Sequence, residues 1–482
     1  MKKKSIFIYG AGEAGISTIL SLEKFTEELK IVGFIDDDLN KVGSKINGIK
    51  VYSFKQFIEL NFTNTKTEVI ISSEFINKDK KESLIEFCNS EKILVKKIPE
   101  YRYWTNENEF KPEEISKLKI SDLLERNEIT VNSQRIKSYL FDKVILITGG
   151  SGSIGSQIVL SVVEYNPKHI IIIDINENSL HGLELELKDL NILTKLKIEF
   201  FTTDVKDKVT LSHVFEKFNP EIIFHAAAYK HVPMMEKNTL SAISNNILGT
   251  FNLLELSKIY NTSKFVFIST DKAINPTNIM GATKRYSECL VQFFALNNQN
   301  CIYVTTRFGN VLGSNGSVIP RFQSLIENSK DIEVTHPDII RYFMTIEEAC
   351  NLVLEASTMA KNREIFVFDM GTPCKINDLA IKLIKLNGLE PNIDIKIKYT
   401  GLRPGEKLME ELLANDDNTI KTHHPKILKA KSKKINYDKY FENLKLLRKY
   451  VEANNSLEAV RILKICLPEF KSNNSEYTIL DN

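Results

Sequence analysis

The sequence predicts an α/β protein in which two Rossmann-like units follow each other along the chain. An apolar, β-branched strand runs into a glycine-rich turn twice, first at residues 5–15 and again at residues 143–155. Segments with strand-like and helix-like apolar periods alternate after both turns. In each unit acidic residues follow the second strand, where such folds contact a nucleotide ribose. This regular alternation predicts doubly wound parallel sheets.

Composition narrows the class of protein. The chain has 482 residues, and a prior of about 150 residues per domain suggests roughly three structural units. A net charge of +2 favours neither nucleic acid nor an anionic membrane surface as a partner. No apolar run approaches the ~20 residues that span a bilayer, and the basic start MKKK leads directly into a short strand. We therefore expect a cytoplasmic protein without a membrane span in this chain.

The six cysteines are scattered and form no CxxC pair. Their spacing supports neither a zinc site nor a disulfide framework, so we expect reduced thiols and no bound metal.

Residues 1–100 are expected to form a partial Rossmann-like domain. Gly10, Gly12 and Gly15 have the GxGxxG spacing of a dinucleotide-binding turn. The strand at residues 31–35 ends in three aspartates, Asp36 to Asp38, at a distance suited to a ribose contact. The same glycines are also compatible with a tight strand–helix turn that binds nothing. A polar connector at residues 101–140 follows, with the only tryptophan, Trp104, and a short helix expected at residues 121–129.

Residues 141–310 are expected to form a second Rossmann core that binds NAD. Gly149, Gly152 and Gly155 allow backbone amides and a helix N-terminus to approach a pyrophosphate. Asp174 ends the next strand, 19 residues after Gly155, and can accept hydrogen bonds from an adenosine ribose. Because no arginine stands beside it to accept a 2′-phosphate, NAD is favoured over NADP. The full set of expected cofactor-binding residues is Gly149, Gly152, Ser153, Ile154, Gly155, Asp174, Asp204, Val205, Ala226, Ala227, Ala228 and Lys284.

Polar side chains also follow the strand at residues 265–268. Thr270, Asp271 and Lys272 lie at its carboxyl end, where open α/β sheets bind ligands. Met280 and Lys284 begin a predicted helix and share one of its faces. A general acid, a general base and a second lysine are thus expected to converge, although Met280 cannot transfer a proton.

Several long motifs together resemble the extended short-chain dehydrogenase/reductases, and more narrowly the nucleotide-sugar 4,6-dehydratases of polysaccharide and glycan biosynthesis. The motifs are TGGSGSIGS (148–156), HAAAYKHVPMME (225–236), STDKAINPTNIMGATKR (269–285), RFGNVLGSNGSVIPRF (307–322), HPDIIRYFMT (336–345) and GLRPGEKLMEEL (401–412). The resemblance covers residues 141–425. Residues 1–100 also resemble the N-terminal domain of the longer, configuration-retaining branch. Many members of that branch begin with transmembrane helices, so this chain is expected to be either a naturally soluble form or a shortened one.

The resemblance gives Met280 a meaning. Most short-chain dehydrogenases have a Tyr-x-x-x-Lys pair where this chain has Met280 and Lys284, whereas the longer retaining dehydratases are similar to this chain in having methionine. The implied catalytic residues are Thr270, Asp271, Lys272, Met280 and Lys284. Thr270 would contact the C4 hydroxyl of the sugar, Lys284 the nicotinamide ribose, Asp271 the departing C6 hydroxyl and Lys272 the C5 proton. Burial is expected to lower the pKa of Lys272 so that it can act as a base.

The expected substrate-binding residues are Lys230, His231, Asn310, Ser314, Ser317, Arg321, Arg341, Arg403 and Glu406. The loop with the two serines suits phosphate oxygens, and Arg341 and Arg403 suit a diphosphate or a uridine ribose. Residues 311–425 form the expected substrate-binding part, mixed with the core. Residues 426–482 are expected to be a helical tail. Beyond Asn415 we expect one short strand followed by two packing helices, which serve as interface or cover.

The expected function is that of a retaining UDP-N-acetylglucosamine 4,6-dehydratase, a lyase with tightly bound NAD that acts as a homo-oligomer. Two alternatives stay open on the same scaffold, an inverting 4,6-dehydratase and a nucleotide-sugar 4-epimerase. A third alternative, suggested by Met280 and the additional N-terminal unit, is an inactive nucleotide-sensing protein.

Overall fold

The computed structural model describes residues 4–22, 29–60, 62, 66–73, 76–99, 115–118, 122, 129–411, 419–431 and 436–481. Two compact units are distinguished, and each is described by itself. The first comprises Met1–Asn127, Phe322–Ile332 and Asp378–Lys398, and the second comprises Glu128–Arg321, Glu333–Asn377 and Tyr399–Asn482. Trp104 and nearly all of the short helix expected at residues 121–129 lie outside the described residues.

The first unit contains a seven-stranded sheet in the order β3-β4-β2-β1-β5-β6-β7. Its five inner strands are parallel, whereas β3 and β7 join the two edges in antiparallel fashion. The strands are β1 (Lys4–Tyr9), β2 (Leu29–Ile35), β3 (Lys45–Ile46), β4 (Ile49–Tyr52), β5 (Thr67–Ile71), β6 (Leu94–Lys97) and β7 (Ser116–Lys117). The helices are α1 (Glu13–Leu22), α2 (Phe54–Ile58) and α3 (Lys78–Ser90). The expected βα succession of this unit is confirmed.

A later segment of the chain returns to the first unit. Most of helix α15 (Ile376–Leu386) belongs to it, and Lys382 of this helix forms a 2.6 Å ion pair with Glu82 of α3. Lys385 and Glu86, one turn further along both helices, pair at 3.4 Å. Because these partners are about 300 residues apart in the chain, no local pattern in the sequence indicates the pairing.

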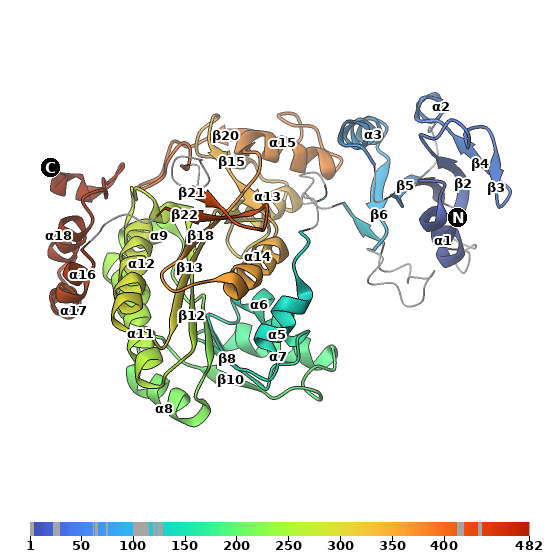
Figure 1. Ribbon diagram of the computed structural model, residues 1–482. Coiled ribbons are helices and arrows are strands. Elements are labelled where there is room, and N and C mark those ends of the chain that lie inside the picture. Colours follow the sequence, from blue (N-terminus) through green and yellow to red (C-terminus); the bar gives the residue numbers. More distant parts are fainter. Residues whose placement is uncertain are drawn as a thin grey trace. The chain divides into compact units, whose positions relative to one another are not determined.

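The second unit contains a nine-stranded sheet in the order β10-β9-β8-β11-β12-β13-β18-β22-β21 (Figure 1). Its first seven strands are parallel, and β22 and β21 extend the edge as an antiparallel pair. The strands are β8 (Val144–Thr148), β9 (His169–Asp174), β10 (Ile198–Thr202), β11 (Ile222–His225), β12 (Lys264–Thr270), β13 (Ile302–Phe308), β18 (Ile365–Phe368), β21 (Thr419–Lys421) and β22 (Ile427–Ala430). The strand order reverses at β8, between β9 and β11, which is where such sheets bind nucleotides.

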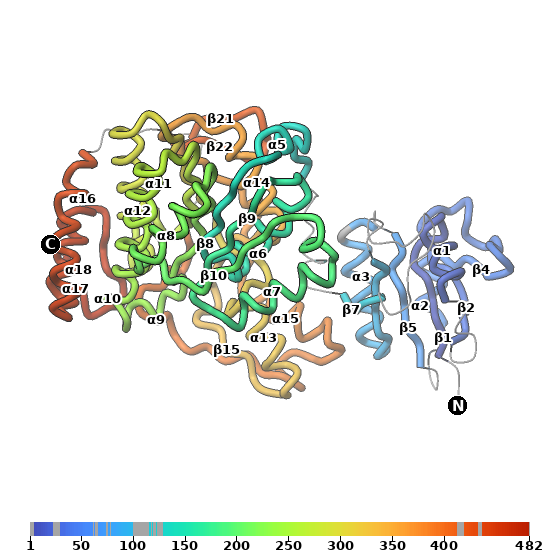
Figure 2. The backbone as a smooth tube through the Cα atoms, turned by 90° about the horizontal axis from the view of Figure 1, so that it is seen from below, coloured from blue at the N-terminus to red at the C-terminus, as the bar shows by residue number. Residues whose placement is uncertain are grey.

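Helices cover both faces of this sheet (Figures 1 and 2). Successive strand residues point to opposite faces, so Phe265 and Phe267 of β12 join one buried cluster while Val266 and Ile268 join the other. One face carries α8 (Lys208–Phe218), α11 (Thr250–Ile259) and α12 (Ile279–Asn297). The other carries α5 (Ser133–Leu140), α6 (Ser153–Val163), α7 (Glu177–Asp189) and α14 (Ile346–Met359). The predicted doubly wound fold is confirmed.

Shorter elements complete the second unit. Helices α9 (Val232–Lys237) and α10 (Thr239–Ala242) lead into the π-helix η4 (Ile243–Gly249), and the 3₁₀ turn η5 (Asp271–Ala273) follows β12. Two small sheets pair β14 (Asn310–Val311) with β17 (Phe343–Met344) and β16 (Ile340–Arg341) with β19 (Cys374–Lys375). Helix α13 (Val318–Glu327) and strands β15 (Ile332–Val334) and β20 (Ile397–Tyr399) lie where the chain passes between the two units.

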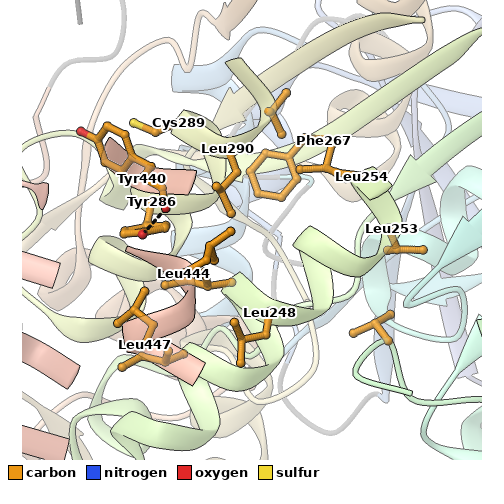
Figure 3. Packing of buried hydrophobic residues seen from close by; sticks show 14 of the residues in the cluster. Leu248, Leu253, Leu254, Phe267, Tyr286, Cys289, Leu290, Tyr440, Leu444 and Leu447 are labelled. Atoms are coloured by element: carbon orange, nitrogen blue, oxygen red, sulfur yellow. Dashed lines mark hydrogen bonds between the residues drawn. The ribbon is translucent and has the colours of Figure 1, made fainter. Parts of the chain in front are cut away.

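The last three α-helices pack against α12, whereas strands β21 and β22 before them extend the sheet. Helices α16 (Asp438–Glu442), α17 (Leu444–Glu452) and α18 (Ser456–Cys466) precede a final 3₁₀ turn, η6 (Glu476–Leu480). Figure 3 shows Leu444 and Leu447 packed among leucines of the α11–α12 face, with the Tyr286 hydroxyl donating to the Tyr440 carbonyl at 2.6 Å. This packing agrees with the expected covering role, but the expectation of one strand and two helices is incomplete. The described residues beyond Asn415 contain two strands, β21 and β22, and three α-helices. The two strands pair with each other, and β22 also pairs with β18.

All six cysteines are free thiols. Within the described parts of the chain, no helix combines the length and the apolar character that crossing a membrane requires.

Truncating Leu447 tests how strongly the C-terminal helices stabilise the second unit. Leu447 is fully buried, whereas its neighbour Leu446 is 39% exposed. Leu447→Ala is expected to destabilise the protein by about 2–5 kcal/mol, because the change removes buried methyl groups and leaves a cavity. Leu446→Ala is the matched control and should shift the thermal unfolding midpoint far less. Equal midpoints for the two variants would contradict the packing role.

Candidate functional site

The glycine turn after β8 has no room for a side chain at Gly149 or Gly155. Gly149 has a φ of +66°, and a Cβ added there would come within 2.6 Å of the Ala227 backbone nitrogen. Only glycine combines this backbone conformation with such a close approach. A Cβ on Gly155 would lie 2.0 Å from the Gly149 carbonyl oxygen, so α6 can begin directly against the turn.

The other residues expected to bind a cofactor surround this turn. Gly152 is the N-cap of α6 and supplies no side-chain acceptor, so the first amides of the helix stay open toward an anion. Asp174 ends β9, where its two carboxylate oxygens accept from the Ser151 amide at 3.0 Å and the Asn176 amide at 2.9 Å. The remaining members lie in the first turn of α6, after β10 and after β11: Ser153, Ile154, Asp204, Val205, Ala226, Ala227 and Ala228.

Thr270, Asp271 and Lys272 form one hydrogen-bonded group at the end of β12. Asp271 Oδ1 accepts from the Thr270 hydroxyl at 2.7 Å, from the Lys272 amide at 2.8 Å and from Lys272 Nζ at 2.9 Å. Its second oxygen, Oδ2, is buried and has no hydrogen-bond partner among the described residues. A buried carboxylate oxygen without a partner is costly, so the site is prepared for a donor that a substrate would bring.

The charges around Lys272 favour its ammonium form. Burial lowers its pKa, as the sequence predicts, but the neighbouring Asp271 and Glu410 carboxylates outweigh that effect and raise the pKa above its ordinary value, even with Arg341 opposing them. The expected net lowering of the pKa of Lys272 is therefore not found. The sequence shows only Asp271 next to it, whereas the second carboxylate comes from a segment more than 130 residues away.

The start of α12 packs closely against η5. Asn278 caps α12 by accepting from the Gly281 amide at 2.7 Å, and a Cβ on Gly281 would lie 2.2 Å from the Lys272 carbonyl oxygen. Met280 is buried in the first turn of this helix, and Lys284 follows one turn later. The predicted helix start and the shared face of these two residues are confirmed.

Lys284 has an environment unlike that of Lys272. Its ammonium nitrogen lies 4.1 Å from the centre of the Phe267 ring, on strand β12. Burial lowers the pKa of Lys284 to about 7, and the negative charge of Glu288 opposes this only in part. Near neutral pH Lys284 can therefore exchange a proton, while Lys272 keeps its own.

Several expected substrate-binding residues approach this group. Asn310 accepts from Lys272 Nζ at 3.3 Å and donates to the Tyr342 carbonyl at 3.1 Å. In the following loop the Asn315 amide donates to Ser153 Oγ at 3.1 Å, which joins the loop to the glycine turn. Ser314 donates to the Val311 carbonyl, whereas the buried Ser317 hydroxyl has no partner among the described residues.

Positive groups line the same loop. A Cβ on Gly316 would come 2.8 Å from the His231 ring, so the imidazole lies against the loop. Burial lowers the pKa of His231, and the charges of Lys230 and Arg403 lower it further. Burial also lowers the pKa of Lys230. The positive charges of Lys230 and Arg403 that act on His231 favour an anion that would lie near it. Arg321 is exposed near the start of α13.

Arg341 and Arg403 lie on either side of Glu406. Arg403 is exposed and reaches Glu406 at 3.3 Å. Arg341 is buried, and its guanidinium donates to the carbonyls of Ile340, Lys407 and Leu408 besides lying 3.6 Å from Glu406. A phosphate contact from Arg341 would thus have to replace backbone partners, whereas Arg403 is accessible.

Glu410 was missed by the sequence reasoning. Its carboxylate is buried, 3.7 Å from Lys272 and 3.9 Å from Arg341. The available signal was its i,i+4 spacing from Glu406 in GLRPGEKLMEEL, but that spacing alone does not indicate which of the three glutamates in the motif faces the site.

The first unit contains a second turn with matching contacts. Gly10 has a φ of +109°, and Asp36 accepts from the Ala11 amide at 2.7 Å and the Asp38 amide at 2.8 Å, as Asp174 does in the second unit. Burial works against the negative charge of Asp36, yet these amides and Lys41 lower its pKa. A nucleotide at this turn remains a prediction. No group of three metal-ligating side chains occurs in the part of the chain that the structure describes.

The chain is similar to known proteins over most of its length. Residues 145–432 match the family described as polysaccharide biosynthesis protein, and residues 1–94 match the family described as C2185-like, N-terminal. The chain is 40% identical over 436 residues to the capsular polysaccharide biosynthesis protein CapD of Staphylococcus aureus, covering 89% of this chain and 72% of that one. It is 36% identical over 284 residues to a UDP-N-acetylglucosamine 4,6-dehydratase (inverting) of Campylobacter jejuni, covering 58% of this chain and 79% of that one.

Among solved structures, Pen from Bacillus thuringiensis is 34% identical with a TM-score of 0.56, covering 61% of this chain and 90% of that one. The resemblance seen in the sequence is confirmed. The chain belongs to the polysaccharide biosynthesis protein family, among the nucleotide-sugar dehydratases and epimerases of the extended short-chain dehydrogenase/reductase fold.

Proposed function

We propose that this chain is an NAD-dependent, retaining UDP-N-acetylglucosamine 4,6-dehydratase of glycan or polysaccharide biosynthesis. It would oxidise C4 of the sugar, eliminate water across C5 and C6, and return hydride to C6 to give a UDP-4-keto-6-deoxy-HexNAc sugar. The observation that carries the proposal is the hydrogen-bonded Thr270–Asp271–Lys272 group around the buried Asp271, whose Oδ2 has no hydrogen-bond partner among the described residues. A homo-oligomeric state and a cytoplasmic location are expected from the sequence and belong to the same proposal.

The residues around the glycine turn fit NAD. The turn has no room for side chains at Gly149 and Gly155, and the first amides of α6 suit a pyrophosphate. Asp174 would hold the adenosine ribose, and Lys284 would hold the nicotinamide ribose. When bound, NAD would supply the hydride acceptor for C4 and the hydride donor for C6.

Oxidation requires a group that takes the C4 hydroxyl proton. Tyrosine serves this purpose in most short-chain dehydrogenases, and Met280 cannot replace it. Thr270 would orient the hydroxyl, while Lys284 is the nearby base, because its pKa of about 7 leaves much of it neutral at physiological pH.

Elimination requires an acid and a base at the same time. The Lys272 ammonium lies 2.9 Å from Asp271 Oδ1. Transfer of one proton along this contact turns Lys272 into the neutral amine that can take the C5 proton. The same transfer turns Asp271 into the acid that can protonate the departing C6 hydroxyl. The Asp271–Lys272 ion pair can thus supply both the base and the acid for elimination. An epimerase eliminates no water and would not need this pair.

Met280 at the tyrosine position favours the retaining reaction, whereas the Campylobacter relative is named as inverting. Incubation with UDP-N-acetylglucosamine, without added NAD, is expected to give a product that has lost the mass of one water and keeps the configuration at C5. Mass spectrometry and NMR measure these outcomes, and Lys272→Ala should bind UDP-sugar without dehydrating it. An inverted C5 would identify the inverting reaction, a C4 epimer without water loss would identify an epimerase, and binding without turnover would identify a sensing protein.

Gly149→Ala tests the cofactor site. The added methyl group would meet the Ala227 backbone in a left-handed conformation that alanine avoids, so bound NAD is expected to fall at least tenfold, the effect of about 1.4 kcal/mol. NAD released by denaturing the purified protein is the measurement. Gly182→Ala on α7 is the control, since its Cβ would meet nothing within 4 Å. Full NAD content in Gly149→Ala would contradict the assignment.

The pKa of Lys284 predicts a pH dependence. A lysine that takes a proton must be neutral, so the rate of substrate oxidation is expected to rise with pH through about 7 and to level off above it. Rapid-mixing absorbance of the reduced cofactor follows this step. In Lys284→Arg the guanidinium stays charged, so the rise should disappear along with most of the activity. An unchanged rise in that variant would remove Lys284 as the base.

A further inference from the structure

Lys272 is surrounded by groups from three segments of the second unit. Asp271 lies 2.9 Å from its nitrogen on the same 3₁₀ turn, Asn310 of β14 lies at 3.3 Å, and Glu410 lies at 3.7 Å. Arg341 of β16 is the other charged group that acts on this lysine. Lys272 thus has two carboxylates within reach, of which the proposed chemistry uses only Asp271.

Backbone hydrogen bonds fix the position of the segment that carries Glu410. The Ile340 amide donates to the Leu408 carbonyl at 3.0 Å, and Met409 forms a β-bridge with Ile340. The Arg341 guanidinium donates to the carbonyls of Lys407 and Leu408, which ties the same segment to β16. These contacts deliver the Glu410 carboxylate to a buried position between Arg341 and Lys272. A buried carboxylate is stable only with such partners.

We propose that Glu410 is a positioning residue for Lys272, which it fixes between Asp271, Asn310 and its own carboxylate so that the proton of the ion pair rests on the lysine until substrate arrives. This inference rests on the proposed function for its catalytic meaning. Among the described residues the charged partners of Glu410 are Lys272 and Arg341, and in this proposal it acts through Lys272.

The arrangement has a chemical consequence. Glu410 stabilises the charged form of Lys272 and disfavours the form with Asp271 protonated and Lys272 neutral. A neutral side chain at position 410 removes this preference, so Lys272 gives up its proton at lower pH. The lysine also loses one of the groups that hold its nitrogen toward Asn310 and Asp271.

Glu410→Gln tests the proposal with the full chain. The reactivity of Lys272 toward an amine-acylating reagent, followed as a function of pH by mass spectrometry of the peptide that carries it, gives the midpoint at which the amine becomes neutral. This midpoint is expected to fall by about one pH unit in Glu410→Gln, a tenfold change in the proton equilibrium. Glu411→Gln is the matched control, because exposed Glu411 pairs with Lys407 and Asn275 instead. An unchanged Lys272 midpoint in folded Glu410→Gln would overturn the proposal.

Turnover gives a second readout. With UDP-N-acetylglucosamine, Glu410→Gln is expected to move the elimination limb of the pH profile to lower pH, because Lys272 releases its proton more easily. It is also expected to lower kcat about tenfold or more with KM little changed, because the loss of a group that holds the Lys272 nitrogen in place outweighs the easier proton release. Glu410→Asp keeps the charge one methylene further away and should restore part of both effects. It also serves if the glutamine variant does not fold. If KM rises as much as kcat falls, and the pH profile of turnover does not shift, the positioning role is overturned.

The two proposals can fail separately. Absence of turnover in the wild-type protein would reject the dehydratase function, while the labelling midpoint of Lys272 would still decide whether Glu410 controls it. Turnover in the wild type with identical midpoints in all variants would reject only the role of Glu410.

Discussion

The carbonyl oxygen of Lys272 lies so close to α12 that a methyl group on Gly281 would come within 2.2 Å of it. This contact fixes how closely the two elements pack. It allows the first turn of α12, which carries Met280, to pack directly against η5 at the end of β12. Asn278 fixes the start of the helix at the same point. Any larger residue at position 281 would push the start of α12 away from the η5 turn that carries Asp271 and Lys272.

The two lysines of the proposed site have opposite properties. Lys284 is buried and Lys272 is half-buried, and removal from water lowers the pKa of each. Lys272 has Asp271 and Glu410 beside it, which reverse the effect, whereas Lys284 lies over the Phe267 ring with Glu288 opposing only in part. When their environments give two groups of the same kind different pKa values, one site can carry out acid and base chemistry at a single pH. The oxidation and elimination steps of the proposed reaction can therefore use different lysines.

The two glycine turns show how far local sequence reaches. Gly10 and Gly149 both adopt positive φ. Asp36 and Asp174 each accept from one amide of their glycine turn and from the amide two residues further along the chain. Glycine spacing and the acidic residue after the second strand were sufficient to predict both turns, because each is built from residues close in the chain. The substrate loop was also predictable, since it follows its strand directly.

The sequence by itself determined the order of strands and helices, the glycine turns, the polar end of β12 and the start of α12. Each depends on periodicity, caps and turn residues within a short window. Only the tertiary structure decided the direction in which the pKa of Lys272 shifts and placed Glu410 beside this lysine. It also decided that the Arg341 guanidinium donates to backbone carbonyls. It also decided that residues 378–398 join the first unit. These properties depend on groups that are more than 60 residues apart in the chain, and the electrostatic field at a buried atom is the sum over all of them.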